Sequence, residues 1–238
     1  MRKLIIASVM ALLPMLSMAA GGGVHLEKAN VDIADQASLQ RGAKTFVNYC
    51  LSCHSAQYQR YNRMGADLGL TDAQVKENLM LAGDKVGDTM TIAMSSADAK
   101  KWFGNPPPDL SVTARSRGAD WLYTYFTTFY ADDSRPFGVN NAVFKDVGMP
   151  HVLVDLEGGL KKAITQDDGH GNMVVTGYEP PISAEYEQVA RDLTNFLVYV
   201  GEPIQLKRQQ MGWKVLLFLA VFFVLAYLMK KEFWRDVH

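Results

Sequence analysis

The sequence predicts a mainly α-helical domain with loop insertions and one short β-hairpin, followed by a single C-terminal transmembrane helix. Apolar residues recur at helical spacing along 36–50 and again along 184–200, which indicates two helices that each bury one face. Residues 213–229 form an apolar run interrupted by only one charged residue, Lys214. Stretches rich in glycine, asparagine, aspartate and proline between these segments predict the loops.

The first 19 residues predict a secretory signal peptide rather than part of the fold. Arg2 and Lys3 form a positive start, an apolar segment covers 4–16, and Ser-Met-Ala at 17–19 fits a cleavage site. This apolar segment is too short to span a bilayer comfortably. We therefore expect cleavage after Ala19 and export of the remaining chain.

Two cysteines three positions apart are followed at once by a histidine, in the order Cys50-Leu51-Ser52-Cys53-His54. Cys-x-x-Cys-His is the signature of covalent c-type haem attachment. On one helical turn Cys50 and Cys53 share a face, so both thiols can reach the vinyl groups of one porphyrin, and His54 can bind its iron axially.

Other uses of the two cysteines fit the sequence less well. A structural zinc site would need a second pair of ligands, and a thioredoxin-like pair belongs near a βαβ pattern; the sequence shows neither. The chain has only 2 cysteines, so none remains for a disulfide. Export agrees with the haem interpretation, because covalent attachment in bacteria takes place outside the plasma membrane.

Capping residues predict where the helices begin. We expect Asp35 or Ser38 to cap the helix that carries the haem motif, and the capping box Thr71-Asp72-Ala73-Gln74 to begin a helix that runs to about Ala82. Ser95 or Ser96 should begin a helix that runs to about Phe103. Asp120 should cap an aromatic-rich helix through Tyr130, and Ser183 should cap the last helix of the domain.

The segment Asn105-Pro106-Pro107-Pro108-Asp109-Leu110 predicts a rigid extended loop, because consecutive prolines cannot continue a helix. Such a loop can lie along the haem edge. Arg115 and Arg117 follow it, and a planar guanidinium suits a haem propionate well. The alternative is that both arginines are simply solvated.

The second axial ligand is sought in the irregular segment 131–160, where Gly148-Met149-Pro150-His151 offers both a thioether and an imidazole. A thioether ligand at Met149 would raise the reduction potential relative to a second imidazole. Pro150 restricts the backbone beside it. His151 keeps a bis-histidine alternative open.

The last part of the chain predicts a hairpin and an anchor. Lys161 to Thr165 and Asn172 to Gly177 indicate two strands with His170 at the turn. Residues 207–231 predict a transmembrane anchor with flanking lysines and aromatic residues at its interfaces. The signal peptide then places the haem domain, residues 20–206, in the periplasm and the tail, residues 232–238, in the cytoplasm.

The exported domain is acidic. Residues 20–206 contain 23 Asp and Glu against 16 Lys and Arg, a net charge of −7, although the whole chain carries only −1. No basic patch interleaved with aromatic residues is present, which excludes a nucleic-acid partner. An acidic surface would attract a basic protein and speed the encounter.

Taken together, these features resemble the cytochrome c1 family, the haem subunit of the bacterial cytochrome bc1 complex. The resemblance covers nearly all of the mature chain. It is carried by the Cys50–His54 motif, Pro107-Pro108-Asp109-Leu110-Ser111, Gly148-Met149-Pro150, Tyr178-Glu179-Pro180-Pro181-Ile182, and Met211-Gly212 leading into one C-terminal anchor.

The resemblance implies an expanded class I cytochrome c fold with one covalent haem c. It implies that Cys50 and Cys53 attach the haem, that His54 and Met149 bind its iron, and that Arg117, or Arg115 close by, binds the propionates beside Pro108. The implied partners are a cytochrome b subunit, a Rieske iron–sulfur protein as donor, a cytochrome c as acceptor, and the lipid membrane.

The implied activity is electron relay within a quinol–cytochrome c reductase, with no acid–base catalytic residue in this chain. Two alternatives remain open. One is a haem enzyme or sensor with a labile sixth ligand, in which Met149 would only pack. The other is a membrane-anchored carrier or oxidase subunit outside a bc1 complex.

Overall fold

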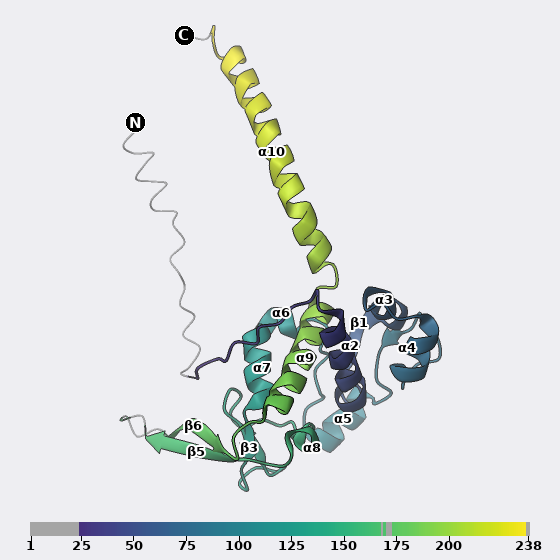
Figure 1. The fold of residues 1–238 in the computed structure, drawn as a ribbon, viewed down its shortest axis with the longest axis vertical. Helices are drawn as coiled ribbons and strands as arrows, with labels where there is room; N and C mark the ends of the chain where they lie inside the picture. The colour runs from purple at the N-terminus through teal and green to yellow at the C-terminus, as the bar shows by residue number, and fades with distance from the viewer. Residues whose placement is uncertain (1–23, 168, 170–172, 237–238) are drawn as a thin grey trace.

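The computed structural model describes residues 24–167, 169 and 173–236. Within this part of the chain, helices pack into one domain with three two-stranded antiparallel sheets, and a long C-terminal helix projects away from it (Figure 1). The predicted signal peptide and His170, which was predicted at the hairpin turn, lie outside the described residues.

The helices and strands follow the order predicted from the sequence, with several short additions. They are α2 (Gln36–Thr45), the π-helical turn η1 (Phe46–Cys50), β1 (Ala56–Arg60), α3 (Tyr61–Asp67), α4 (Asp72–Asn78), β2 (Thr89–Met90), α5 (Ser96–Phe103), α6 (Thr113–Arg117), α7 (Ala119–Thr127), β3 (Phe129–Ala131), β4 (Val139–Asn141), α8 (Val154–Glu157), β5 (Lys162–Asp167), β6 (Met173–Glu179), α9 (Ala184–Gly201) and α10 (Gln205–Phe233).

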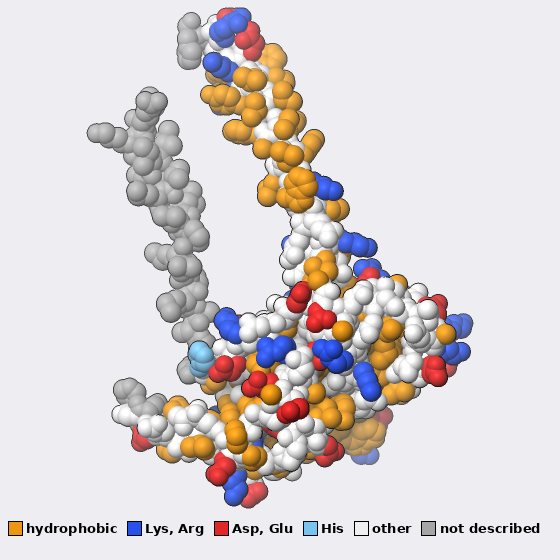
Figure 2. Space-filling model, in the orientation of Figure 1, with side chains coloured by type: hydrophobic (Ala, Val, Ile, Leu, Met, Phe, Trp, Pro, Cys, Tyr) orange, Lys and Arg blue, Asp and Glu red, His pale blue; other side chains and the backbone are white. Residues whose placement is uncertain are grey.

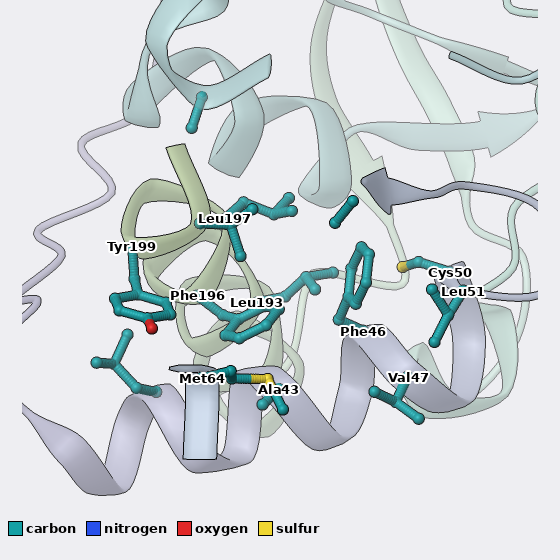
Figure 3. Packing of buried hydrophobic residues seen from close by; sticks show 14 of the residues in the cluster. Ala43, Phe46, Val47, Cys50, Leu51, Met64, Leu193, Phe196, Leu197 and Tyr199 are labelled. Atoms are coloured by element: carbon teal, nitrogen blue, oxygen red, sulfur yellow. The ribbon is translucent and has the colours of Figure 1, made fainter. Parts of the chain in front are cut away.

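The core of the domain is organised around the crossing of α2 and α9. A Cβ atom on Gly42 would lie only 2.1 Å from the carbonyl oxygen of Asp192 and 2.7 Å from the Cβ of Phe196. Glycine is therefore required for the two backbones to approach this closely. Beside the crossing the rings of Phe46 and Phe196 pack 5.5 Å apart, in the buried cluster shown in Figure 3.

A buried carboxylate fixes the register of the same two helices. Asp192, on α9, accepts hydrogen bonds from the Ser38 hydroxyl at 2.7 Å and from Arg41 Nε at 2.6 Å, both on α2. Gln188 donates a third at 2.9 Å. Because a buried carboxylate is costly without such partners, a shift of one helix along the other would be strongly disfavoured.

Four of the predicted caps are confirmed. Asp35 accepts from the backbone N–H of Ser38, Ser95 from that of Asp98, and Ser183 from that of Tyr186. Thr71 forms the predicted capping box with Gln74, although α4 ends at Asn78 rather than near Ala82. Each cap satisfies a backbone donor at the first turn of its helix.

The predicted cap at Asp120 is wrong. Helix α7 begins after Gly118, which adopts φ 91°, and Asp120 lies within its first turn. The Asp120 carboxylate instead accepts from Lys28 Nζ at 2.6 Å and from the backbone N–H of Ala29 at 3.0 Å. The helix also ends at Thr127, because the chain continues into strand β3 and pairs with β4.

The hairpin prediction is confirmed by the pairing of β5 with β6. The β1–β2 and β3–β4 pairs were not predicted, because both are short and join segments without clear alternation of apolar residues. The first pair closes the segment between the haem motif and α5, and the second fixes the loop after α7. The fold is therefore mainly α, as expected, with more small sheets than the single predicted hairpin.

Helix α10 has the length and composition of a single membrane span, with a mean hydropathy of 2.2 over its most apolar window. None of its side chains is buried against the domain. Figure 2 shows hydrophobic side chains covering it, with basic side chains near both ends. At about 1.5 Å per residue, its 29 residues exceed a hydrocarbon core of about 30 Å.

One carboxylate joins the anchor to the domain. Glu202, at the end of α9, accepts from Arg208 Nε at 2.5 Å on the first turns of α10, and it lies 3.2 Å from Arg115 Nη1 on α6. The hydrogen bonding to Arg208, together with the charges of Arg208 and Arg115, holds the pKa of Glu202 below its usual value. The Arg115 guanidinium is therefore already paired with a carboxylate, at the junction between α9 and α10.

Candidate haem-binding site

The haem motif lies at the end of α2, where the helix widens and then turns. In the π-helical turn η1, the Leu51 N–H donates to the Phe46 carbonyl five residues earlier, at 3.0 Å. The Cys50 carbonyl then accepts from both Cys53 N and His54 N, at 3.0 and 2.8 Å. Cys50, Cys53 and His54 therefore lie within one hydrogen-bonded turn.

Both cysteines are free thiols in very different surroundings. Cys50 is buried beside Phe46 and Leu51 (Figure 3), and burial raises the pKa of its thiol to about 12. Cys53 is half-buried. A redox-active pair requires a thiol of lowered pKa, so the environment of Cys50 opposes the thioredoxin-like interpretation.

The imidazole of His54 is held from behind by the proline loop. Its Nδ1 lies 2.7 Å from the Pro108 carbonyl oxygen, so Nδ1 carries the proton and Nε2 has a free lone pair. Burial lowers the pKa of His54, which favours the neutral ring. A neutral imidazole oriented by a backbone carbonyl through its other nitrogen is the usual form of a metal-binding histidine.

The loop that carries Pro108 is itself tied to the haem motif. The Leu110 N–H donates to the Ser55 carbonyl at 2.8 Å, and the Gln57 N–H donates to the Asp109 carboxylate at 2.9 Å. The other oxygen of Asp109 accepts from Ser111 N. Pro108 therefore contributes through its carbonyl group and through the shape of the loop.

Met149 lies in the irregular segment, half-buried against a small cluster formed by Phe129, Val139 and Val147. Its sulfur accepts a hydrogen bond from the Tyr125 hydroxyl at 3.4 Å. A thioether sulfur has two lone pairs, so this bond leaves one for a metal.

His151, the alternative ligand, is engaged elsewhere. Its Nε2 lies 2.6 Å from Glu157 Oε2, and its ring stacks on Phe129 with centroids 4.7 Å apart and planes 3° apart. The side chain is only 2% exposed. This geometry favours Met149 over His151 as the residue that presents a donor atom.

The two candidate arginines differ in their partners. Arg115 pairs with Glu202, whereas the guanidinium of Arg117 lies over the Trp121 ring, 5.1 Å from its centroid. Within the described ranges no carboxylate forms an ion pair with Arg117. Arg117 is therefore the better placed of the two to meet an anionic group.

Helix α7, which the sequence predicts to be rich in aromatic residues, carries them on more than one face. Tyr123 and Phe126 are indeed buried. Trp121 and Tyr125, however, stack 5.1 Å apart on another face, where Tyr125 meets Met149 and Trp121 meets Phe144. Trp121 and Tyr125 are four residues apart, and this spacing was the signal that they share a helix face. Phe129, whose ring lies 5.1 Å from that of Tyr125, belongs to strand β3.

The residues present fit a covalent haem. Two free thiols and a neutral imidazole with an available nitrogen meet in one turn. In the part of the chain that the structure describes, no group of three or more His, Cys, Asp or Glu side chains could hold a metal ion by itself. The donor set therefore suits a porphyrin iron, which needs only two protein ligands.

Comparisons with known proteins show which family the chain resembles. The family model described as "Cytochrome C1 family" matches residues 27–237. The chain is 51% identical to the cytochrome c1 of Allochromatium vinosum, over all of both chains. It is 48% identical to a Nitrosomonas europaea protein named ammonia monooxygenase gamma subunit, over 95% of both, and 28% identical to the cytochrome c1 of Rhodospirillum rubrum, over 99% of this chain and 97% of that protein.

Proposed function

Because the chain belongs to the cytochrome c1 family, we propose that it passes single electrons from a Rieske iron–sulfur protein to a cytochrome c. The chain carries one covalent haem c and is the haem electron-transfer subunit of a bc1 complex. The observation that carries the proposal is the His54 imidazole, fixed by Pro108 with Nε2 available, directly after two free thiols.

In the proposed site, the Cys50 and Cys53 thiols would form the two thioether bonds, and His54 and Met149 would supply the two protein ligands of the iron. Arg117 would bind the propionates, while Arg115, two residues earlier in α6, pairs with Glu202. When bound, the haem supplies a one-electron ferric–ferrous couple, and the soft Met149 sulfur favours the ferrous form.

The chain's own residues restrict what this couple can do. If His54 and Met149 both bound the iron, oxygen or peroxide would have no open coordination site, and the haem would be limited to outer-sphere electron transfer. Tyr125, which donates to the Met149 sulfur, stacks on Trp121, and Trp121 in turn meets Phe144, so aromatic rings line this side of the site. Proton transfer has no role for these residues, so the quinol chemistry belongs to other subunits of the complex.

We further propose that α10 anchors the chain with the haem domain on the periplasmic side, and that a cytochrome b subunit is its neighbour in the membrane. The signal peptide expected at 1–19 supports this orientation. The acidic balance of residues 20–206 would attract a basic electron acceptor.

The proposal is tested by purifying the full-length chain from detergent-solubilised membranes. We expect a pigment that stays with the protein in acidified acetone, co-purification with a b-type haem protein and an iron–sulfur protein, and quinol–cytochrome c reductase activity. Recovery without those partners, or with an oxygenase as the name of the Nitrosomonas relative suggests for that protein, would contradict it. Protease added to intact spheroplasts should cut the haem domain and spare the C-terminal tail.

A further inference from the structure

We propose that three buried polar residues, His151, Glu157 and Lys161, act as positioning residues that hold the Met149 sulfur at the iron. We call them the buried triad. The inference rests on the proposed role of Met149 as axial ligand and adds the means by which its loop is kept in place.

The buried triad is centred on the Glu157 carboxylate, which is 5% exposed. One of its oxygens lies 2.6 Å from His151 Nε2, and the other forms an ion pair with Lys161 Nζ. Lys161 also donates to the Thr127 carbonyl at the end of α7, at 2.8 Å. The triad therefore joins the segment after Met149 to helix α7, which carries Tyr125.

Aromatic rings enclose the triad on several sides. Phe129 stacks on His151. The Tyr186 ring lies nearly perpendicular to the His151 ring, with the two centroids 6.2 Å apart. Lys161 Nζ lies 4.7 Å from the centroid of Tyr178 and 6.0 Å from that of Tyr186. Strands β3 and β6 and helix α9 thus surround these polar groups and exclude water from them.

Phe129 connects the triad to the methionine. It stacks on His151 and also belongs to the small cluster against which Met149 packs. Pro150 lies between the two residues and restricts the backbone that joins them. A displacement of the His151 ring would therefore move both the backbone next to Met149 and the Phe129 ring against which Met149 packs.

Apolar residues of similar size would satisfy the same space without the cost of desolvating a lysine and a glutamate. Burial indeed lowers the pKa of Lys161, against the opposing effect of Glu157. The charged partners instead fix the positions of the side chains, because a hydrogen bond is strong only at a particular distance and angle between donor and acceptor. A segment with little regular structure, such as 142–153, gains most from such fixed points.

Loss of the triad should open the sixth coordination position without unfolding the domain. An external ligand such as cyanide can bind ferric haem only while Met149 is displaced, so its binding rate follows the open fraction of the loop. We expect Glu157→Gln to raise this rate by about tenfold or more, and to weaken the methionine–iron charge-transfer band.

The matched control is Lys162→Met, which removes an exposed lysine next to Lys161 and should change neither quantity. If Glu157→Gln does not accumulate, His151→Phe keeps the stack on Phe129 and removes only the hydrogen bond to Glu157. Thermal unfolding is measured in parallel. A lower Tm with an unchanged band and unchanged cyanide kinetics at low temperature would overturn the proposal, because it would show a role in stability alone.

Met149→Leu separates this inference from the proposed function. If that variant keeps the charge-transfer band and the slow cyanide binding of the unmodified protein, Met149 is not the ligand, and the ligand assignment itself fails. If Met149→Leu abolishes the band while both triad variants behave like Lys162→Met, the assignment stands and only the positioning role is rejected.

Discussion

The Tyr125 hydroxyl donates a hydrogen bond to the sulfur of Met149 at 3.4 Å, from a side chain otherwise packed among the aromatic rings of Trp121, Phe126 and Phe129. Burial raises the pKa of Tyr125, so the hydroxyl remains protonated and able to donate at any physiological pH. The bond draws electron density from the sulfur and should weaken its donation to ferric iron.

Tyr125→Phe should therefore lower the reduction potential of the haem. A net hydrogen bond of about 0.5–1.5 kcal/mol corresponds to about 20–60 mV for a one-electron couple. Redox titration of the purified protein measures the shift. Tyr123→Phe is the matched control, because the Tyr123 hydroxyl meets Arg191 instead, and an equal shift in both variants would contradict the role of the Met149 bond.

Met149→Leu should keep the covalent haem, because the thioether bonds depend on Cys50 and Cys53. Its potential should fall by about 100 mV or more, since axial ligands set haem potentials over a range of about 0.8 V. Reduction by the Rieske protein should then stall. Met173→Leu, at a methionine that is 63% exposed on β6, should leave the potential unchanged.

Arg117→Leu should lower the potential by about 40 mV, because removal of a positive charge worth about 1 kcal/mol near the propionates favours the ferric form. Arg115→Leu should change the potential less, since Glu202 already neutralises that guanidinium. Redox titration of both variants decides between the two arginines. A larger shift in Arg115→Leu would reverse the assignment.

Gly42→Ala should destabilise the domain by about 1–3 kcal/mol or more, because the added methyl group would lie 2.1 Å from the Asp192 carbonyl oxygen. Thermal unfolding followed by circular dichroism measures the change. Gly87→Ala serves as control, since nothing lies within 4 Å of the Cβ position there. Equal Tm values for the two variants would show that α2 and α9 do not meet as described.

The Asp120–Lys28 contact predicts a dependence of stability on pH. The Lys28 ammonium and the Ala29 N–H hold the pKa of the Asp120 carboxyl below its ordinary value of 3.8. Its contribution is present above the ordinary pKa and is lost as the pH falls through the lowered, folded-state pKa. Asp120→Asn should thus lower Tm at neutral pH and have little effect in strong acid. A constant difference between the two proteins at all pH values would refute this.

Local signals predicted the helices well. Asp35, Thr71 and Ser183 cap helices as expected, because a cap depends on residues within three positions of each other. The prediction that Asp120 caps a helix failed because its partners are distant in the sequence. Its carboxylate pairs with Lys28 and Ala29, about ninety residues earlier in the chain, and no local pattern announces that pairing.

The site shows the same division between local and distant information. The haem motif and its turn follow from five consecutive residues, and Met149 was a candidate from its loop beside Pro150, which the resemblance to a family then strengthened. The Tyr125 hydroxyl at the sulfur and the engagement of His151 by Glu157 depend on packing between α7, β3 and α8. Sequence periodicity identifies buried faces but does not state which side chains meet across them.

The carboxylate of Glu202 has a mechanical consequence for electron transfer. Since it is bound by Arg208 of α10 and by Arg115 of α6, it restrains the angle between the anchor helix and the haem domain. A change in the tilt of α10 within the bilayer should then change the orientation of the haem domain. Contacts between α10 and neighbouring transmembrane helices should restrain that orientation in the same way. Bilayer thickness and the crowding of membrane proteins would in this way affect the distance between the haem and its electron-transfer partners.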